Sequence, residues 1–259
     1  MGKTILITGA SAGIGEATAR EFAAAANGSL KLILTARRVD KLDLLRDSLL
    51  AEYPELKVLA SKLDVTNYKD EIPAFIKSLP QEFSEIDVLV NNAGLVHGVD
   101  KVGEIKPFDI DVQFNTNVLG LISLTQNVLV GMKQRNRGDI VNMGSIAGRD
   151  PYPGGAIYCA TKAAVSSFSH TLRKELIDTR IRVFEVQPGA VETEFSKVRF
   201  YGDSDKAANV YKGTTPLDAQ DIAEVIVFGC SRKENTVIAE SLVFPSHQAS
   251  ASHVYRRPE

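Results

Sequence analysis

The sequence predicts a single α/β domain built on a doubly wound, mostly parallel seven-stranded sheet with helices on both faces. Short runs rich in β-branched residues and leucine alternate with helical patterns along the chain, which is typical of βαβ units. The first five runs are almost continuously apolar, as strands covered on both faces must be. A chain of 259 residues, 44% of them hydrophobic, is long enough to bury one core of this kind.

The expected elements follow in a regular order until the C-terminal third. The seven expected strands lie at residues 3–8, 30–35, 56–60, 86–90, 139–143, 181–186 and 236–239. The six expected helices lie at residues 13–26, 41–52, 69–79, 108–136, 156–178 and 218–230. The segment at about 193–215 is rich in charge and lacks a clean period, so we interpret it either as a mobile substrate lid or as a plain surface excursion. With a C-terminal tail at about 241–259, the whole chain, 1–259, is expected to form one domain.

Composition excludes several classes of partner. Lys and Arg total 30 against 32 Asp and Glu, a net charge of −2, so no attraction to nucleic acid or to an acidic membrane is expected and a small molecule is the expected partner. The chain has only two cysteines, Cys159 and Cys230, which predicts a reduced protein. Neither these cysteines nor the four histidines have the spacing of metal ligands, so no metal is expected. No stretch approaches the roughly 18 apolar residues of a membrane span, and the N-terminus does not resemble a signal peptide. We therefore expect a cytoplasmic protein.

A glycine-rich turn joins the first expected strand to the first expected helix, at residues 8–15. Small residues let the backbone approach a pyrophosphate, and the free N–H groups at the start of the helix attract the anion. The candidate cofactor-binding residues of this turn are Gly9, Ser11, Gly13, Ile14 and Gly15. A tight turn alone could require the same glycines, but the strand-turn-helix context favours a dinucleotide.

The residues after the second expected strand discriminate between the two nicotinamide cofactors. NAD-binding folds usually place an acidic residue here for the ribose 2′-hydroxyl, whereas this chain has Arg37 and Arg38. Guanidinium groups suit the oxygens of a 2′-phosphate. The pair predicts NADP, unless both arginines only begin a solvated loop.

Three side chains are placed for proton transfer. Tyr158 and Lys162 are one helical turn apart and share a face, and Ser145 ends the fifth expected strand, at the edge where open α/β sheets bind ligands. A nearby ammonium stabilises a phenolate and lowers its pKa from the ordinary value of about 10. Taken singly, the three would be a packed tyrosine, a solvated lysine and a turn serine, but together they predict a catalytic site.

Two further motifs accompany these residues: Asn-Asn-Ala-Gly at residues 91–94, and Pro-Gly at residues 188–189 followed by Thr193. Together, the motifs resemble those of the short-chain dehydrogenase/reductase family over essentially the whole chain. The resemblance implies a Rossmann fold and an oxidoreductase. It implies that Tyr158 is the general acid/base, that Lys162 holds the nicotinamide ribose and lowers the pKa of Tyr158, and that Ser145 binds the substrate oxygen. Asn117 would complete a catalytic tetrad through a water, or would be a helix-interior amide bonded to neighbouring backbone.

The same resemblance implies further cofactor contacts. Asp64 and Val65 would contact the adenine, although Asp64 could instead cap a helix. Asn91 would lie along the cofactor ribose. The turn after the sixth strand would meet the nicotinamide through Pro188, Gly189, Val191 and Thr193, although Pro-Gly is also a simple turn signal. Members of the family commonly pair through the helices at 108–136 and 156–178, so a homotetramer is expected.

Longer motifs around residues 145–150, 191–200 and 244–256 resemble the NADP-dependent 3-hydroxy acid dehydrogenases, which oxidise L-serine and L-allo-threonine. A substrate of this class carries a carboxylate and needs a cation, for which Arg199 and Arg149 are the candidates. Arg199 is preferred because it lies in the expected lid, although it could equally be a solvated lid arginine. The alternatives are a broad-specificity NADPH-dependent ketone or aldehyde reductase and a non-catalytic NADP-binding protein.

Overall fold

The structure, a computed structural model, describes residues 2–257, so residue 1 of the predicted domain and residues 258–259 of the predicted tail lie outside the described residues. Seven strands form one sheet in the order β3-β2-β1-β4-β5-β6-β7. They are β1 (Thr4–Thr8), β2 (Lys31–Ala36), β3 (Lys57–Lys62), β4 (Val88–Asn91), β5 (Gly138–Met143), β6 (Ile181–Pro188) and β7 (Glu240–Val243). Every neighbouring pair is parallel, which confirms the predicted sheet.

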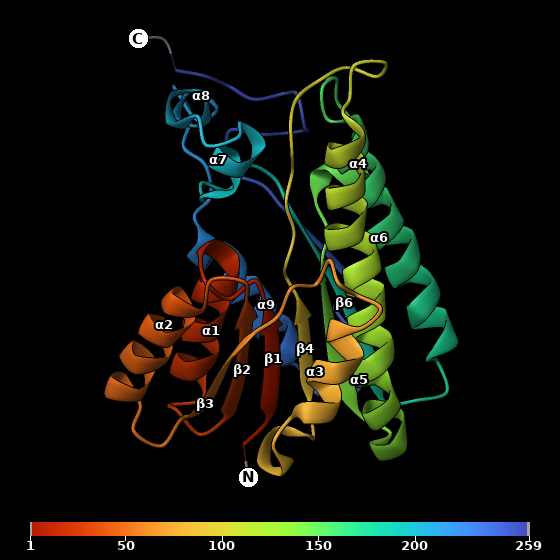
Figure 1. Ribbon diagram of the computed structural model, residues 1–259. Helices are drawn as coiled ribbons and strands as arrows, with labels where there is room; N and C mark the ends of the chain where they lie inside the picture. Colours follow the sequence, from red (N-terminus) through yellow and green to blue (C-terminus); the bar gives the residue numbers. More distant parts are fainter. Residues whose placement is uncertain (1, 258–259) are drawn as a thin grey trace.

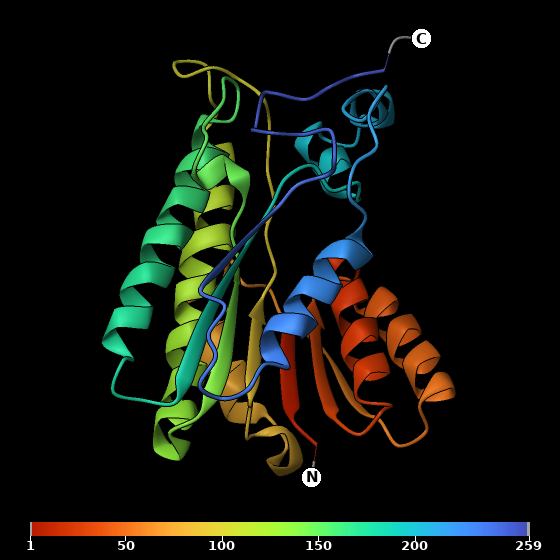
Figure 2. The same ribbon diagram turned by 180° about the vertical axis from the view of Figure 1, so that it is seen from behind.

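Helices cover both faces of the sheet (Figures 1 and 2). One face carries α1 (Gly13–Ala25), α2 (Val39–Glu52) and α9 (Ala219–Cys230), and the other carries α3 (Glu71–Ser78), α4 (Pro107–Phe114), α5 (Leu121–Arg135) and α6 (Ala156–Glu175). Because side chains alternate along a strand, Ile5 and Ile7 of β1 pack into one core and Leu6 packs into the other. This two-sided burial explains why the central strands are continuously apolar.

The seventh strand begins four residues later than predicted, at Glu240 rather than at residue 236. Its ladder with β6 runs from Glu185 opposite Glu240 to Pro188 opposite Val243. The apolar run at 236–239 is a loop whose Ile238 packs against the core. Apolar residues serve core packing there without strand pairing, which is why apolarity alone misplaced the strand.

The predicted helix at 108–136 is continuous but not regular. Between α4 and α5, residues Asn115–Gly120 form a π-helical segment (η2). Gly120 lets this segment approach the loop after β3, because a Cβ at this position would come 2.6 Å from the carbonyl oxygen of Val65. Such π-helical segments are rare and occur frequently at functional sites.

The carboxyl ends of the strands lie together at one end of the molecule, opposite the N-terminus (Figure 1). Two short helices, α7 (Phe195–Arg199) and α8 (Ser204–Asn209), lie beyond this end within the predicted lid segment. The end of the described tail lies against the residues that follow α8, since Arg256 donates to the carbonyls of Val210 and Lys212 and the backbone N–H of Arg257 donates to the carbonyl of Gly213 at 2.7 Å. Among the described residues, no helix is both long and apolar enough to span a membrane.

Candidate active site

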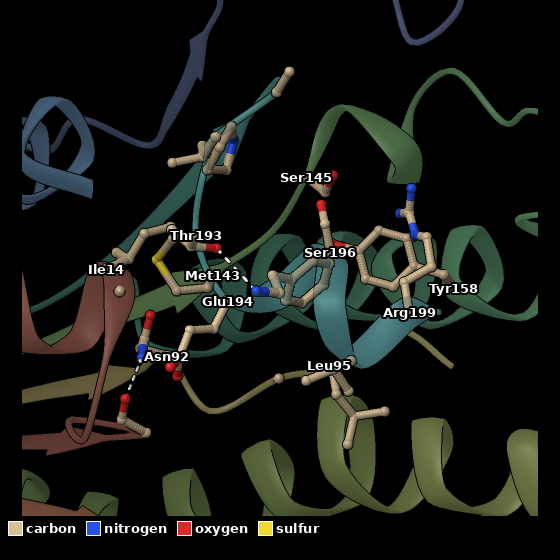
Figure 3. A pocket seen from close by; sticks show the side chains of 18 of the residues that line it. Ile14, Asn92, Leu95, Met143, Ser145, Tyr158, Thr193, Glu194, Ser196 and Arg199 are labelled. Carbon is tan, nitrogen blue, oxygen red and sulfur yellow. Dashed lines mark hydrogen bonds between the residues drawn. The ribbon is translucent and has the colours of Figure 1, made fainter. Parts of the chain in front are cut away.

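A cleft of about 670 Å³ opens at the carboxyl ends of the strands. It lies where the strand order reverses between β1 and β4, the topological switch point at which open α/β sheets bind ligands. Loops after the strands, the start of α6, the lid segment and the tail form its walls. In Figure 3, Ile14 and Asn92 lie toward one end of the cleft, and Ser145, Tyr158 and Arg199 lie toward the other.

The glycine-rich turn forms one wall, because Gly9, Ser11, Gly13 and Ile14 all line the cleft. Gly9 and Gly13 have φ angles of +66° and +55°, a backbone region that favours glycine. Helix α1 begins at Gly13, so its free N–H groups face this wall. The turn therefore has the backbone geometry that a pyrophosphate requires.

Two predicted cofactor contacts do not line the cleft. Gly15 packs behind the turn, where a Cβ would come 2.5 Å from the carbonyl oxygen of Gly9. Asn91 is 3% exposed, and its Nδ2 donates to Asn142 Oδ1 and Thr125 Oγ1, both at 2.9 Å. The last side chain of β4 faces the interior and Asn92 lines the cleft instead, so a contact between Asn91 and the cofactor ribose stays a prediction.

The two arginines after β2 both line the cleft. Arg38 donates to Ser11 Oγ of the glycine-rich turn through Nε at 3.3 Å and through Nη2 at 3.2 Å. Its Nη1 forms an ion pair with Glu194 Oε2 at 2.9 Å, and Lys41 Nζ lies 3.1 Å from Glu194 Oε1. The guanidinium predicted to bind a 2′-phosphate thus holds a carboxylate from the lid segment.

Asp64 and Val65 line the cleft, as the family pattern implies for adenine contacts. The carboxylate of Asp64 also stabilises its own turn, since Oδ1 accepts from the backbone N–H of Thr66 at 3.0 Å and from Thr66 Oγ1 at 2.7 Å. The side chain therefore stabilises a turn and does not cap a helix, since α3 begins at Glu71 with Asp70 at its N-cap, while Asp64 still forms part of the wall.

The turn after β6 also lines the cleft, through Pro188, Gly189, Val191 and Thr193, and Thr193 lies against Gly13 of the glycine-rich turn. It is fixed from the tail, because Gln248 Oε1 accepts from the backbone N–H of Ala190 at 2.8 Å. A side chain at Gly189 would collide with Gln248, since a Cβ there would lie 2.4 Å from Oε1. The glycine thus permits the close approach of the tail.

Ser145, Tyr158 and Lys162 converge on the cleft, each less than a tenth exposed. Ser145 caps a short 3₁₀ helix (η3, Ile146–Gly148), and its Oγ accepts from the backbone N–H of Ala147 at 3.1 Å. On α6, Lys162 Nζ lies 5.7 Å from the ring centroid of Tyr158 and donates to the carbonyl of Met143 at 2.7 Å. The predicted constellation therefore forms.

Burial dominates the electrostatics of this group. It raises the pKa of the Tyr158 phenol, while a hydrogen bond with Ser145 and the charge of Arg199 act in the opposite direction. Burial also lowers the pKa of Lys162 to about 8, partly opposed by the carboxylate of Glu185. The pKa of Tyr158 is thus shifted upward, opposite to the direction that the resemblance implied, because burial outweighs the nearby charge.

Asn117 lies in the π-helical segment and is 1% exposed. Its Oδ1 accepts from the backbone N–H of Leu95 at 2.9 Å, and its Nδ2 donates to the carbonyl of Leu95 at 2.8 Å and to Thr161 Oγ1 at 3.1 Å. The side chain thus ties the loop after β4 to α6, one residue before Lys162. These contacts match the second of the two roles expected for Asn117, a helix-interior amide bonded to neighbouring backbone, rather than a place in a catalytic tetrad.

The structure separates the two candidate arginines for a substrate carboxylate. Arg199 of α7 lines the cleft, and its Nη2 donates to Tyr152 Oη at 3.0 Å. Arg149 does not line the cleft and forms an ion pair with Glu240 of β7. The structure thus brings Arg199 to the cleft, whereas the charge of Arg149 is paired at the edge of the sheet and its substrate role stays a prediction.

The lid segment is anchored next to Arg199. Tyr201 Oη donates to Asp109 Oδ2 at 2.5 Å, and His97 Nδ1 contacts the other carboxylate oxygen at 2.8 Å. The backbone N–H of Gly98 donates to the carbonyl of Arg199 at 3.0 Å. Tyr201 has a φ angle of +53°, an uncommon conformation for a residue with a Cβ.

One trio of possible metal ligands occurs among residues 2–257, although the sequence spacing indicated none. His170, Glu185 and Glu240 offer ligand atoms within 4.8 Å of one another, across α6, β6 and β7. His170 and Arg149 both contact the carboxylate of Glu240, so this carboxylate already has cationic or hydrogen-bonding partners. The trio does not line the cleft.

Sequence reasoning missed several residues of the substrate end. Gln248 and Phe195 lie within the segments 244–256 and 191–200 that carry the resemblance, but no contact was predicted for either of them. Gln248 bonds Ala190 from 58 residues away, and Tyr152 bonds Arg199 from 47 residues away, so neither contact has a local signal. Phe195 packs edge-to-face against Tyr158 with ring centroids 5.7 Å apart.

The comparisons with known proteins identify the family. The model of the short chain dehydrogenase family matches residues 3–202, so the chain belongs to this family, as predicted. A curated NADP-dependent 3-hydroxy acid dehydrogenase of Schizosaccharomyces pombe is 56% identical over 256 residues, covering 99% of this chain and 97% of that protein. A protein of the same name from Salmonella typhi is 46% identical over 223 residues, covering 86% of each chain.

A solved structure is similar over the whole fold. The closed form of a serine dehydrogenase complexed with NADP+ has a TM-score of 0.90 and 39% identity, and the alignment covers 98% of this chain and all of that one. The sequence prediction of the fold class is thereby confirmed.

Proposed function

We propose that this chain is an NADP-dependent oxidoreductase that transfers a hydride between the cofactor and the 3-carbon of small 3-hydroxy acids, such as L-serine and L-allo-threonine. One observation carries the proposal: the cleft that holds Ser145, Tyr158 and Lys162 also holds Arg199, which forms no ion pair with a carboxylate of the described residues. The names of the relatives agree with the predicted activity and cofactor.

The cleft fits the cofactor at the residues that would bind it. Gly9 and Gly13 open the wall beside the N-terminus of α1 for a pyrophosphate, and Arg38 already holds an anionic group. Arg37 lines the same end of the cleft. We assign the nicotinamide contacts to Pro188, Gly189, Val191 and Thr193, which line the same cleft as Tyr158 and Ser145.

The bound nicotinamide supplies a hydride acceptor in oxidation and a hydride donor in reduction. In oxidation, Tyr158 acts in its phenolate form: the 3-hydroxyl hydrogen-bonds Ser145 and gives its proton to the phenolate while a hydride leaves the 3-carbon. In reduction, Tyr158 returns a proton to the carbonyl oxygen. The raised pKa of the buried phenol suits the acid role directly, while the base role requires positive charge at the site, which the Lys162 ammonium contributes.

Asn117 acts on this chemistry through the residues it holds. Its amide bonds Leu95 and Thr161, which fixes the start of α6 against the loop after β4.

We propose that Arg199 binds the substrate carboxylate and that Tyr152 orients the guanidinium of Arg199.

The test measures the formation of NADPH with L-serine and L-allo-threonine in parallel with uncharged alcohols of similar size. The proposal expects turnover of the 3-hydroxy acids at far lower concentrations than of the alcohols. Equal turnover of both sets would favour the broad-specificity reductase instead. Cofactor binding without turnover of any substrate in either direction would favour the non-catalytic alternative.

We further propose a cytoplasmic homotetramer with a mobile lid. Three large apolar side chains at or beside the long helices are exposed in the single chain: Phe108 at 65%, Val130 at 60% and Ile177 at 84%. Burial against other copies would remove this apolar surface from water. Light scattering that gave the mass of a monomer at micromolar concentration would reject the tetramer.

A further inference from the structure

Glu194 occupies the anion-binding end of the cleft. Its carboxylate bridges two cations, with Oε2 at 2.9 Å from Arg38 Nη1 and Oε1 at 3.1 Å from Lys41 Nζ. These two cations lower the pKa of the carboxyl, so Glu194 is charged at neutral pH. In Figure 3 its carboxylate points away from Tyr158 and Arg199.

The position of this bridge is that of a phosphate site. Arg38 also donates to Ser11 in the glycine-rich turn, which fixes its guanidinium at the cleft wall. Lys41 is the third residue of α2, whose N-terminus favours a negative charge. The two cations therefore converge on one anion, and a carboxylate of the same chain is the group that they hold.

We propose that Lys41 joins Arg38 in binding the cofactor 2′-phosphate, and that Glu194 is a built-in competitor that the phosphate displaces. This rests on the proposed use of NADP. A phosphate carries more charge than a carboxylate and can replace both ion pairs, whereas the neutral 2′-hydroxyl of NAD cannot.

Displacement of the Glu194 carboxylate by the 2′-phosphate affects the lid segment, because Glu194 directly precedes α7. The next residue, Phe195, begins α7 and packs against the ring of Tyr158. Arg199 lies one turn further along the same helix. Release of Glu194 by the phosphate therefore frees the first turn of the segment that carries the proposed substrate-binding arginine.

Binding of two adenosine nucleotides to the full-length protein tests this proposal. Adenosine 2′,5′-bisphosphate and adenosine 5′-monophosphate differ only in the 2′-phosphate, and titration calorimetry gives both dissociation constants. Glu194→Gln should tighten bisphosphate binding about three- to tenfold, the effect expected from losing half-exposed ion pairs, and should leave monophosphate binding unchanged. Glu192→Gln, the loss of an exposed carboxylate two residues away, is the matched control and should change neither constant.

Lys41→Met should weaken bisphosphate binding about tenfold without affecting the monophosphate, and should make bisphosphate binding less sensitive to salt. Unchanged or weaker bisphosphate binding by the Glu194→Gln protein would overturn the competitor role. If the unmodified protein bound both nucleotides equally, the proposed NADP specificity would fail, which is a different result from failure of the competitor.

Hydrogen exchange supplies a readout that does not depend on affinity. The bisphosphate, but not the monophosphate, should accelerate amide exchange at residues 194–199 of the unmodified protein. The Glu194→Gln protein should show fast exchange there without any nucleotide. Exchange that the bisphosphate leaves unchanged or slows in the unmodified protein would contradict displacement.

Discussion

The two ends of the cleft are built in different ways. The end beside Arg38 is formed by short turns that directly follow β1, β2 and β3. The end beside Arg199 is formed by contacts between distant segments, since Arg199 bonds Tyr152 from 47 residues away and Tyr201 bonds Asp109 from 92 residues away. The cofactor end is thus defined mostly by local sequence and the substrate end by tertiary packing, and Glu194, which bonds Arg38 from 156 residues away, links the two ends. A mutation that leaves Glu194 and its partners in place should therefore affect one end more than the other.

The largest expected effect separates chemistry from cofactor binding. Tyr158→Phe removes the proton carrier and should lower kcat by about 10²- to 10⁴-fold, the usual contribution of a positioned acid or base. Because the hydroxyl belongs to the substrate end, the dissociation constant for NADPH should change less than about threefold. Calorimetry and steady-state kinetics on the same preparation measure both, and a variant with normal kcat would contradict the mechanism.

Arg199→Met should act on the substrate end alone. Loss of charge-assisted hydrogen bonds to a carboxylate, each about 1.5–3 kcal/mol, should lower kcat/KM for L-serine by about 10- to 100-fold. Activity on an uncharged alcohol should change little. An equal loss on both substrates would mean that Arg199 supports the lid rather than binding the carboxylate.

Lys162 is expected to serve both the cofactor and the catalytic tyrosine. Its burial should make the free energy of unfolding depend on pH. Its pKa is about 8 in the folded chain and 10.5 in the reference state, so the unfolded chain binds more protons between these values. The free energy of unfolding should therefore rise with pH across this window, by on the order of 2 kcal/mol. Urea titrations of the unmodified and Lys162→Met proteins measure the difference, and parallel pH profiles would contradict the shifted pKa.

The smallest expected effect concerns the anchor of the lid. Tyr201→Phe removes the hydrogen bond to Asp109 but keeps the ring, so KM for L-serine should rise about threefold with nearly unchanged kcat. Tyr255→Phe, at another exposed tyrosine, is the control. A fall in kcat without a change in KM would indicate that the anchor positions the reacting groups rather than Arg199.

The same contrast explains what could be predicted from the sequence. The sheet, the glycine-rich turn, and Ser145, Tyr158 and Lys162 follow from local patterns, because strand ends and one helical turn fix their positions. The motif at residues 91–94 could not say which of its asparagines faces the cleft, since neighbouring residues at the end of a strand face opposite ways; the cleft is lined by Asn92 and not by Asn91. The position of Arg149 outside the cleft could not be predicted because its partner, Glu240, lies on a strand 91 residues away.

Electrostatics were the least predictable part of the site. The motif indicated that Lys162 would lower the pKa of Tyr158, but the degree of burial of both groups is a tertiary property. Burial raises one pKa and lowers the other in the free cleft. Similarly, no local signal predicted that Glu194 would reach Arg38, because 156 residues separate them.

The attachment of the tail has a practical consequence for work with this protein. Gln248 supports the turn at Gly189 and Ala190, and Arg257 lies against the lid segment at Gly213. An affinity tag fused after the tail would emerge beside the mouth of the cleft, whereas a tag ahead of β1 would emerge at the opposite end of the sheet (Figure 1). Purification handles, surface tethers and fluorescent fusions therefore belong at the amino end if the kinetics of the cleft are to be left undisturbed.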